Sequence, residues 1–440
     1  MLVKTKWDRD FDISLSTIVI SFLVIILFDG IFRLLADLYR LRILNAWKDL
    51  LILLILYLLT FYIVFIRRKL LLRQWDIIFF FFSISTIPTA IYFHGLVQTI
   101  WGIKIFIIPV LFYILLFNLF ILESPSWEML RKFILVNLIV YIPIFSYALL
   151  QYLTKFEFLR WLSISPWDIS YIKITFIEKT VRAIGTFRHQ FNFGNYSAFI
   201  AIFAFEGILL SRKLLSKIAF LFIFLIAFTG VFISTSRSSL LITVHMLVTL
   251  TLLTYFRQYK KFIKMFLIVL SVALPIMIIY IALFKLGTGR QKFFMFSTLS
   301  TVTRLFVWSH AITHFPFYSS PVTLLFGYGV GSIGGAQALV GDPNWNPVDN
   351  IFLYFLINFG VVGTLLILYL LLKPVFSYIN QIDKIPPNWL DVMVGMTLAI
   401  VFAEGMFATF FDGFPLPYIF WFLHFYFRIK SSELIEEIQI

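Results

Sequence analysis

Runs of about 20 mostly apolar residues recur along the whole chain, and they limit the fold more than any other feature. A helix needs a run of that length to cross the hydrocarbon core of a bilayer. Of the 440 residues, 61% are hydrophobic and 13% are charged, whereas soluble domains are about half apolar and a quarter charged. Because a segment in lipid must satisfy its own backbone hydrogen bonds, the runs predict helices. We therefore expect an all-α polytopic membrane protein.

We count twelve spans and expect residues 1–440 to form a single integral membrane domain. The spans lie near residues 13–35, 50–66, 76–94, 100–122, 133–153, 194–210, 218–234, 238–256, 265–284, 350–372, 391–411 and 416–427. A long connection at 285–349 separates the ninth span from the tenth. The first run is not followed by a small-residue cleavage site, so we interpret it as a retained span.

Basic residues between the runs predict the topology. Compact basic clusters occupy alternate connections and both termini, the internal ones at 67–69, 131–132, 212–217 and 257–264. Cytoplasmic loops carry an excess of lysine and arginine, which places both termini in the cytoplasm. The segment before residue 193, the break at 235–237 and the connection at 285–349 then lie on the extracytoplasmic side.

Charge and cysteine content exclude several classes of function. The net charge of +14 is compatible with nucleic acid binding, but the lysines and arginines lie mainly between apolar runs. Topology-setting charge beside anionic lipid headgroups accounts for them, so we expect a bilayer and no nucleic acid as partner. The chain has no cysteine, which excludes disulfides, thiolate metal sites and cysteine nucleophiles.

The densest polar cluster outside the long connection is the segment 181–192, VRAIGTFRHQFN. It precedes an apolar span, so its backbone amides can form a helix N-terminus, which is a natural anion site. Arg182 and Arg188 beside such a terminus suit a phosphate or pyrophosphate, and His189 and Asn192 complete the polar set. The alternative is that the two arginines only contact lipid headgroups.

Arg237 lies in the segment 234–239, STSRSS, at a tight break between two apolar runs. A charge near membrane depth is costly unless it meets a partner or a water-filled cavity. Two helix ends and four serines around one arginine again suit an anion. Alternatively, the Arg237 side chain extends outward to the membrane surface at a helical hairpin.

In the long connection, the segment 301–315 predicts an amphipathic helix with Arg304 at the border of its apolar face. His310 and His314 lie on the opposite face, four residues apart, which is a spacing that can ligate a metal. No third ligand stands at a useful spacing, so we expect no metal site.

A glycine-rich turn, GYGVG at 327–331, and the pair Asp349–Asn350 follow in the same connection. The turn is not a nucleotide-binding fingerprint, because no βαβ pattern surrounds it. Its glycines let the backbone approach a ligand or bend back to the membrane. Asp349 opens the next span, where a carboxylate can cap the helix or act as a general base.

Together these motifs resemble the superfamily of O-antigen ligases and polymerases. The resemblance covers about residues 182–363. It rests on RAIGTF at 182–187 with Asn192, STSRS at 234–238, Arg304 with Trp308, the glycine-rich turn, and Asp349–Asn350 with Gly360 and Gly363.

The resemblance implies a GT-C-like glycosyltransferase of the bacterial cytoplasmic membrane, with its active site on the periplasmic side. Such an enzyme uses undecaprenyl-pyrophosphate-linked glycans and no cofactor. The arginines Arg182, Arg237 and Arg304 are expected to hold the pyrophosphate, without a metal. In ligases, a histidine near the start of the span after the long connection is thought to activate the acceptor hydroxyl. Here Asn350 is retained, but Asp349 stands where that histidine is expected.

This departure favours a polymerase of the O-antigen, capsule or exopolysaccharide type, with Asp349, Arg304 and Arg237 as catalytic residues. The substrate-binding set is then Arg182, Arg188, His189, Asn192, Arg237, Arg304 and Asn350, and a chain-length regulator is a candidate protein partner. An O-antigen ligase or an O-oligosaccharyltransferase of the same superfamily is the alternative, in which His189, His310 or His314 takes the missing role. From another class, a lipid-linked oligosaccharide flippase would show polar or broken helices at mid-membrane.

Overall fold

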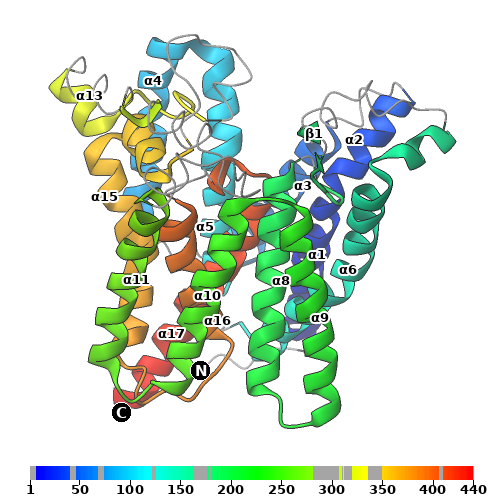
Figure 1. Ribbon diagram of the computed structural model, residues 1–440. Helices are drawn as coiled ribbons and strands as arrows, with labels where there is room; N and C mark the ends of the chain where they lie inside the picture. Colours follow the sequence, from blue (N-terminus) through cyan, green and yellow to red (C-terminus); the bar gives the residue numbers. More distant parts are fainter. Residues whose placement is uncertain are drawn as a thin grey trace. The chain divides into compact units, whose positions relative to one another are not determined.

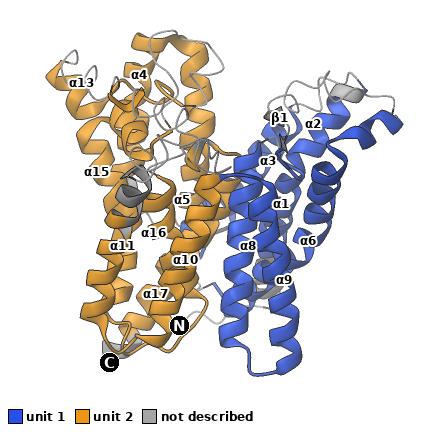
Figure 2. Cartoon of the chain, in the orientation of Figure 1, with its two compact units in different colours: residues 1–70, 115–236 blue, residues 71–114, 237–440 orange. Residues whose placement is uncertain are grey.

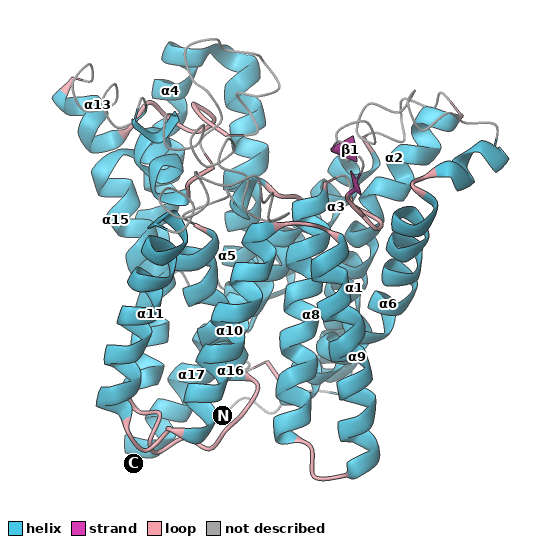
Figure 3. Ribbon diagram, viewed as in Figure 1, coloured by secondary structure: helices cyan, strands magenta, loops and turns pink. Residues whose placement is uncertain are grey.

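The computed structural model describes residues 6–39, 46–67, 74–120, 125–162, 176–177, 180–187, 189–280, 307–309, 311, 320–334, 349–405 and 410–439. These residues are helical apart from turns and one short antiparallel pair, β1 (Phe176–Ile177) with β2 (Thr180–Val181). Figure 3 shows this helical character throughout both halves of the chain. The predicted all-α membrane fold is confirmed.

The elements follow one another along the chain (Figure 1). The α-helices are α1 (Lys6–Ile25), α2 (Asp29–Leu38), α3 (Trp47–Phe61), α4 (Gln74–Gly102), α5 (Ile108–Phe120), α6 (Trp127–Thr154), α8 (Gln190–Leu210), α9 (Leu214–Ile233), α10 (Arg237–Tyr255), α11 (Lys260–Tyr280), α13 (Pro321–Phe326), α15 (Ile351–Asn380), α16 (Leu390–Leu398) and α17 (Leu416–Gln439). The π-helical segments are η3 (Tyr62–Arg67), η4 (Ile103–Ile107) and η8 (Ala399–Glu404), and the 3-10 segments are η1 (Ile26–Phe28), η5 (Glu157–Leu162) and η9 (Phe410–Asp412).

Eight helical stretches of the described chain are long and apolar enough to cross a membrane. They are Ser16–Ala36, Trp47–Ile66, Ile78–Phe120, Trp127–Thr154, Gln190–Leu210, Leu214–Ile233, Arg237–Tyr255 and Ile351–Asn380. The stretch of 43 residues holds two of the predicted spans, because the backbone breaks at Gly95. The chain is an integral membrane protein, and the total of twelve spans stays a prediction.

The chain divides into two compact units (Figure 2). Unit 1 comprises Met1–Leu70 and Leu115–Ser236, and unit 2 comprises Leu71–Ile114 and Arg237–Ile440. The expected single domain, with an amphipathic loop at 285–349, stays a prediction.

In unit 1, α8 and α9 form an antiparallel hairpin that packs against α6. The close approach of α6 to α9 requires glycine at position 230, because a Cβ there would lie only 2.1 Å from the Tyr141 hydroxyl oxygen. That hydroxyl donates a hydrogen bond of 2.7 Å to Ser197 of α8. Small residues and interhelical hydrogen bonds are how helices associate in lipid, which offers no hydrophobic driving force of its own.

In unit 2, a buried network surrounds Arg257, which follows α10. Its guanidinium donates two hydrogen bonds to the Asp391 carboxylate, Nη1 to Oδ2 at 2.8 Å and Nη2 to Oδ1 at 3.2 Å. A third goes to the carbonyl of Pro386 at 3.1 Å, and the Tyr378 hydroxyl donates to Asp391 at 3.1 Å. The two charged side chains are only 10% and 0% exposed. The network therefore joins the end of α10, the end of α15 and the start of α16.

A surface ion pair lies at the same end of unit 2. The Lys260 ammonium lies 3.0 Å from Asp383, in the connection between α15 and α16. The basic connection at 257–264 therefore meets the connection that follows α15. Two connections that meet at one end must lie on one side of the membrane, as the predicted alternation requires.

We predict that substitutions at Arg257 and Asp391 have non-additive effects on the stability of the protein. Removing one partner of a buried ion pair leaves an uncompensated charge and typically costs about 3–5 kcal/mol. Arg257→Met and Asp391→Leu should each lower the melting temperature of the detergent-solubilised protein sharply, and the double variant should recover much of that loss. Additive losses, measured by thermal unfolding of all four proteins, would contradict a direct coupling.

Candidate functional site

The side-chain amide of Gln151 in α6 holds the RAIGTF segment in place. Its Oε1 accepts hydrogen bonds from the backbone N–H groups of Ile184 (3.1 Å) and Gly185 (2.9 Å). Its Nε2 donates to the Gly185 carbonyl at 2.9 Å. Gly185 has a φ of 57°, and a Cβ there would lie 2.8 Å from the Phe193 ring. Only glycine suits this conformation and this space.

Thr186 ties the same segment to the connection between α1 and α2. Its hydroxyl donates to the Leu27 carbonyl at 2.6 Å, and its carbonyl accepts from the Gly30 N–H at 2.7 Å. A Cβ on Gly30 would lie 2.3 Å from the Phe187 carbonyl oxygen, so the two backbones are in direct contact. The segment is thus a rigid loop rather than a loose connection.

The loop also contacts the end of α9, where the STSRSS turn begins. The Ala183 N–H donates to the Ile233 carbonyl at 3.0 Å. Thr235 has a φ of 51°, and the Ser236 N–H bonds to the Ser234 hydroxyl oxygen at 3.2 Å. Unit 1 therefore holds the RAIGTF loop against the end of α9, directly before residues 234–236 of the second predicted motif. Arg237, the next residue, is the first of α10.

His189 is the N-cap of α8. Its Nδ1 accepts from the Phe191 N–H at 3.4 Å, and its carbonyl accepts from the N–H of Asn192 at 3.2 Å. With Nδ1 accepting, Nε2 carries the ring proton of the neutral imidazole. Burial, and then the positive charge of Arg182, lower the pKa of His189 from 6.5 to about 4. Burial disfavours a charge of either sign, but the positive charge of Arg182 and the N-terminus of α8 both favour an anion.

A pH dependence follows from the His189 cap. Its folded-state pKa of about 4 lies below its unfolded value, so protonation favours unfolding. The stability it contributes is complete above about pH 6.5, the ordinary histidine pKa, and is lost as the pH falls towards 4. His189→Asn keeps a good N-cap that does not titrate. We expect the wild type to lose melting temperature faster than this variant between pH 7 and pH 4.5; parallel curves would refute this.

Asn350, not Asp349, is the N-cap of α15. Its Oδ1 accepts from the N–H groups of Phe352 and Leu353, both at 3.0 Å, and its side chain is buried. The next residue donates its N–H to the Gly405 carbonyl at 2.7 Å. The helix-capping role considered for Asp349 is therefore filled by Asn350. The general-base role of Asp349 stays a prediction, as does substrate binding by Asn350.

The glycine-rich turn packs against the backbone of α15 where that helix breaks. The Tyr328 N–H donates to the Ile357 carbonyl at 2.9 Å, and the Gly329 N–H to the Asn358 carbonyl at 3.0 Å. Gly360 has φ 66° and ψ −172°, and a Cβ there would lie 2.3 Å from the Leu325 carbonyl oxygen. The break therefore exists where the turn docks.

The other side of the turn contacts α4. The Gln98 side chain donates to the Gly331 carbonyl at 2.8 Å. A Cβ on Gly102 would lie 2.6 Å from the Gly331 Cα, and a Cβ on Gly329 would lie 2.4 Å from the Ala90 nitrogen. Gly102 and Gly329 are therefore required by these contacts, because a Cβ at either position would clash with the facing backbone. The turn fixes both helices and, through α15, the position of Asn350.

Gly360 and Gly95 offer a matched test of this docking. Both have backbone angles that are essentially confined to glycine and cost other residues about 1–3 kcal/mol. A Cβ on Gly95 (φ 79°), however, would meet no atom within 4 Å. We expect Gly360→Ala to lower the yield of folded protein far more than Gly95→Ala, measured by size-exclusion chromatography in detergent. Equal effects would show that strain alone matters.

Several predicted residues lie outside the described part of the chain. Arg188 and Arg304 are among them, as are His310 and His314, so their predicted roles stay predictions. Of the predicted amphipathic helix at 301–315, residues 307–309 and 311 are described and helical, with Trp308 buried. The described residues contain no cluster of three metal-ligating side chains.

Residues 198–368 match the family model described as O-antigen ligase. The match begins in α8, includes the STSRSS turn, the glycine-rich turn and Asn350, and ends in α15. This part of the chain is therefore similar to O-antigen ligases. No curated protein sequence matches the chain. The resemblance drawn from the motifs is confirmed, and the RAIGTF loop lies just ahead of the O-antigen ligase region.

Sequence reasoning missed the amides that position these O-antigen ligase motifs. Gln151 and Gln98 are described above, and Asn358 accepts from the Ile333 N–H at 3.4 Å and donates to the Tyr354 carbonyl at 2.8 Å. Gln151 and Asn358 are amides within predicted apolar spans, and Gln98 lies between two of them, inside the helical stretch Ile78–Phe120. A buried amide without a hydrogen bond is costly, so its presence in such a span is the signal that could have revealed it.

Gln151 gives a test of loop positioning. Gln151→Leu keeps the approximate volume but leaves the N–H groups of Ile184 and Gly185 without their acceptor. We expect the variant to insert normally and to lose glycan transfer at least tenfold, because the loop that carries Arg182 is released. Thr154→Val is the control, since that hydroxyl bonds only within α6, to Leu150. Wild-type transfer rates in Gln151→Leu would contradict the role.

Proposed function

We propose that this protein is a polysaccharide polymerase that joins undecaprenyl-pyrophosphate-linked repeat units on the extracytoplasmic face of a bacterial cytoplasmic membrane. The family of residues 198–368 supports a glycosyltransferase acting on lipid-linked glycans. The observation that carries the finer proposal is the identity of Asp349, a carboxylate directly before the Asn350 cap. A ligase is expected to have a histidine there.

The proposed reaction is a single displacement at the donor sugar. A hydroxyl of the acceptor repeat unit attacks the anomeric carbon of the growing glycan. The bond from that carbon to the pyrophosphate oxygen breaks, and polyprenyl pyrophosphate leaves with the electron pair. Asp349 accepts the hydroxyl proton, and the configuration at the anomeric carbon is expected to invert.

The arginines Arg182, Arg237 and Arg304 stabilise the charge that develops on the leaving group. Preorganised positive charge in a site of this kind is usually the largest catalytic contribution. Two local findings support an anion site at this loop: the positive charge of Arg182 close enough to act on His189, and the adjacent N-terminus of α8. No metal or other cofactor is needed for this chemistry.

The contact between the connections at 257–264 and 381–389 supports the proposed topology, in which both lie in the cytoplasm with the termini. Long extracytoplasmic segments then present Arg182 and Asp349 to the periplasm. A chain-length regulator remains a proposed protein partner of such a polymerase.

A ligase is the second candidate, because the description of the matched family is O-antigen ligase. It would use the same donor and differ in the acceptor. The flippase alternative is favoured by the broken helices α4 and α15, since transporters often bind substrate at such breaks. In this protein the break at Gly360 is filled by the backbone of the glycine-rich turn, which leaves it a structural role.

A reconstituted assay tests the proposal. Purified protein and a defined lipid-linked repeat unit should give a ladder of lengthened glycans when products are resolved by size. We expect Arg237→Ala and Asp349→Ala to reduce the ladder at least a hundredfold. Arg212→Ala, in the α8–α9 connection on the proposed cytoplasmic side, is the control and should leave it unchanged.

One outcome would contradict the proposed site, and another would contradict the polymerase activity. A ladder of wild-type intensity from correctly inserted Arg237→Ala would show that Arg237 is not needed for glycan transfer and would contradict the arginine site. Absence of a ladder together with glycosylation of an added core-lipid or peptide acceptor would assign the protein as a ligase or an O-oligosaccharyltransferase.

A further inference from the structure

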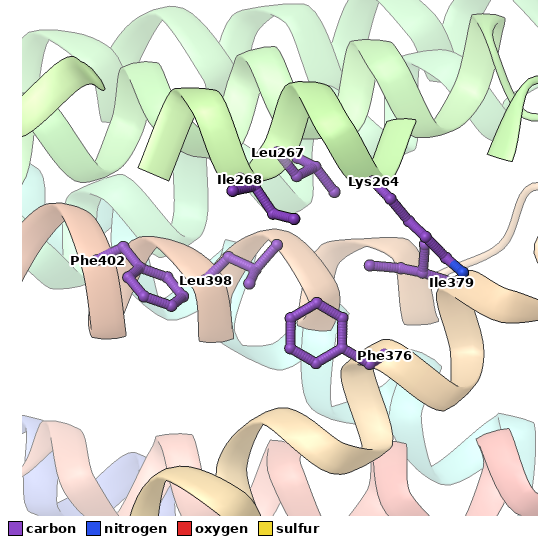
Figure 4. A pocket seen from close by; sticks show the side chains of 7 residues that line it. All are labelled: Lys264, Leu267, Ile268, Phe376, Ile379, Leu398 and Phe402. Carbon is purple, nitrogen blue, oxygen red and sulfur yellow. The ribbon is translucent and has the colours of Figure 1, made fainter. Parts of the chain in front are cut away.

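A groove opens between α11, α15 and the continuous helix of α16 and η8 in unit 2 (Figure 4). Its volume is about 70 Å³. Its floor consists of Leu267, Ile379 and Leu398, each no more than 4% exposed. Its rim includes Ile268 and Phe376, which are 57% and 39% exposed. The groove is therefore apolar inside and open along one side.

Lys264 lies at one end of the groove, with its ammonium beside Ile379, and Phe402 lies at the other end (Figure 4). Lys264 is the one charged residue in this lining. Neighbouring carboxylates are already engaged: Asp383 pairs with Lys260 at 3.0 Å, and Asp391 pairs with Arg257 at 2.8 Å. Within the described part of the chain, no ion pair involves Lys264.

The end of unit 2 that carries Lys264 has an excess of positive charge. The segments 257–264 and 381–391 at this end contain the basic residues Arg257, Lys260, Lys261, Lys264 and Lys384 and the acidic residues Asp383 and Asp391. An anion at this end of the groove would therefore be attracted, and the low dielectric of the neighbouring membrane strengthens that attraction.

We propose that the groove binds one acyl chain of an anionic phospholipid and that the phosphate of this lipid contacts the Lys264 ammonium. Unit 2 is embedded in a membrane, so an apolar groove open on its surface is filled by lipid chains. Lys264 is one helical turn, about 6 Å, beyond Lys260, a depth from which a lysine side chain reaches the headgroups. The charge at the end of the groove selects an anionic headgroup over a zwitterionic one.

The test measures lipid binding to the purified full-length protein by native mass spectrometry, with added phosphatidylglycerol or phosphatidylcholine. We expect tighter binding of phosphatidylglycerol. Loss of one lysine contact near a membrane surface should weaken it about fivefold, so Lys264→Gln should bind phosphatidylglycerol about as weakly as phosphatidylcholine. Ile268→Trp should fill the groove and weaken both lipids.

Matched controls lie on the same helix. Lys261→Gln and Met265→Trp change exposed residues of α11 that do not line the groove, and both should bind lipid as the wild type does. Wild-type phosphatidylglycerol affinity in Lys264→Gln would overturn the headgroup contact, and wild-type affinity in Ile268→Trp would overturn the groove. Arg237→Ala, which should abolish glycan transfer, should retain lipid binding, so the two proposals fail separately.

Discussion

The cost of burying polar groups in an apolar protein organises this structure. In lipid there is no water to satisfy an amide or a guanidinium, so each must find a partner inside the protein. Gln151 meets that requirement with the backbone of the RAIGTF loop, and Gln98 with the glycine-rich turn. Arg257 meets it with Asp391. In every case the partner lies far away in the sequence, so the requirement defines the tertiary fold.

Glycine residues meet a second requirement of this fold, the close approach of two backbones. Polar groups can reach backbone partners only where two backbones approach closely, and a Cβ prevents that approach. Gly331 and Gly360 stand at such contacts, facing the backbones of Gln98 and Leu325, and Gly185 leaves room for the Phe193 ring. The glycines of the family motifs are therefore scaffold residues that hold the charged and polar residues beside them.

Because buried amides and glycines hold the backbone in place, the charged residues beside them can be positioned before the proposed reaction. Electrostatic catalysis depends on charges that are already in place before the reaction, because reorganising them would consume the stabilisation they provide. The loop that carries Arg182 is held by Gln151 and Thr186, and the span that follows Asp349 is held by its Asn350 cap. The proposed lipid groove lies apart from these residues and concerns the membrane surface instead.

The sequence by itself determined the membrane class, the helical fold and the resemblance to O-antigen ligases, because apolar run length and motif order are local properties of the chain. It also placed the two predicted anion-binding motifs, at 182–192 before a helix and at 234–239 at a turn. It did not determine which residue caps α15, where α4 and α15 break, or that Gln151 and Asn358 hold the loops. Those features depend on which backbone lies opposite each residue, and only the tertiary structure decides that.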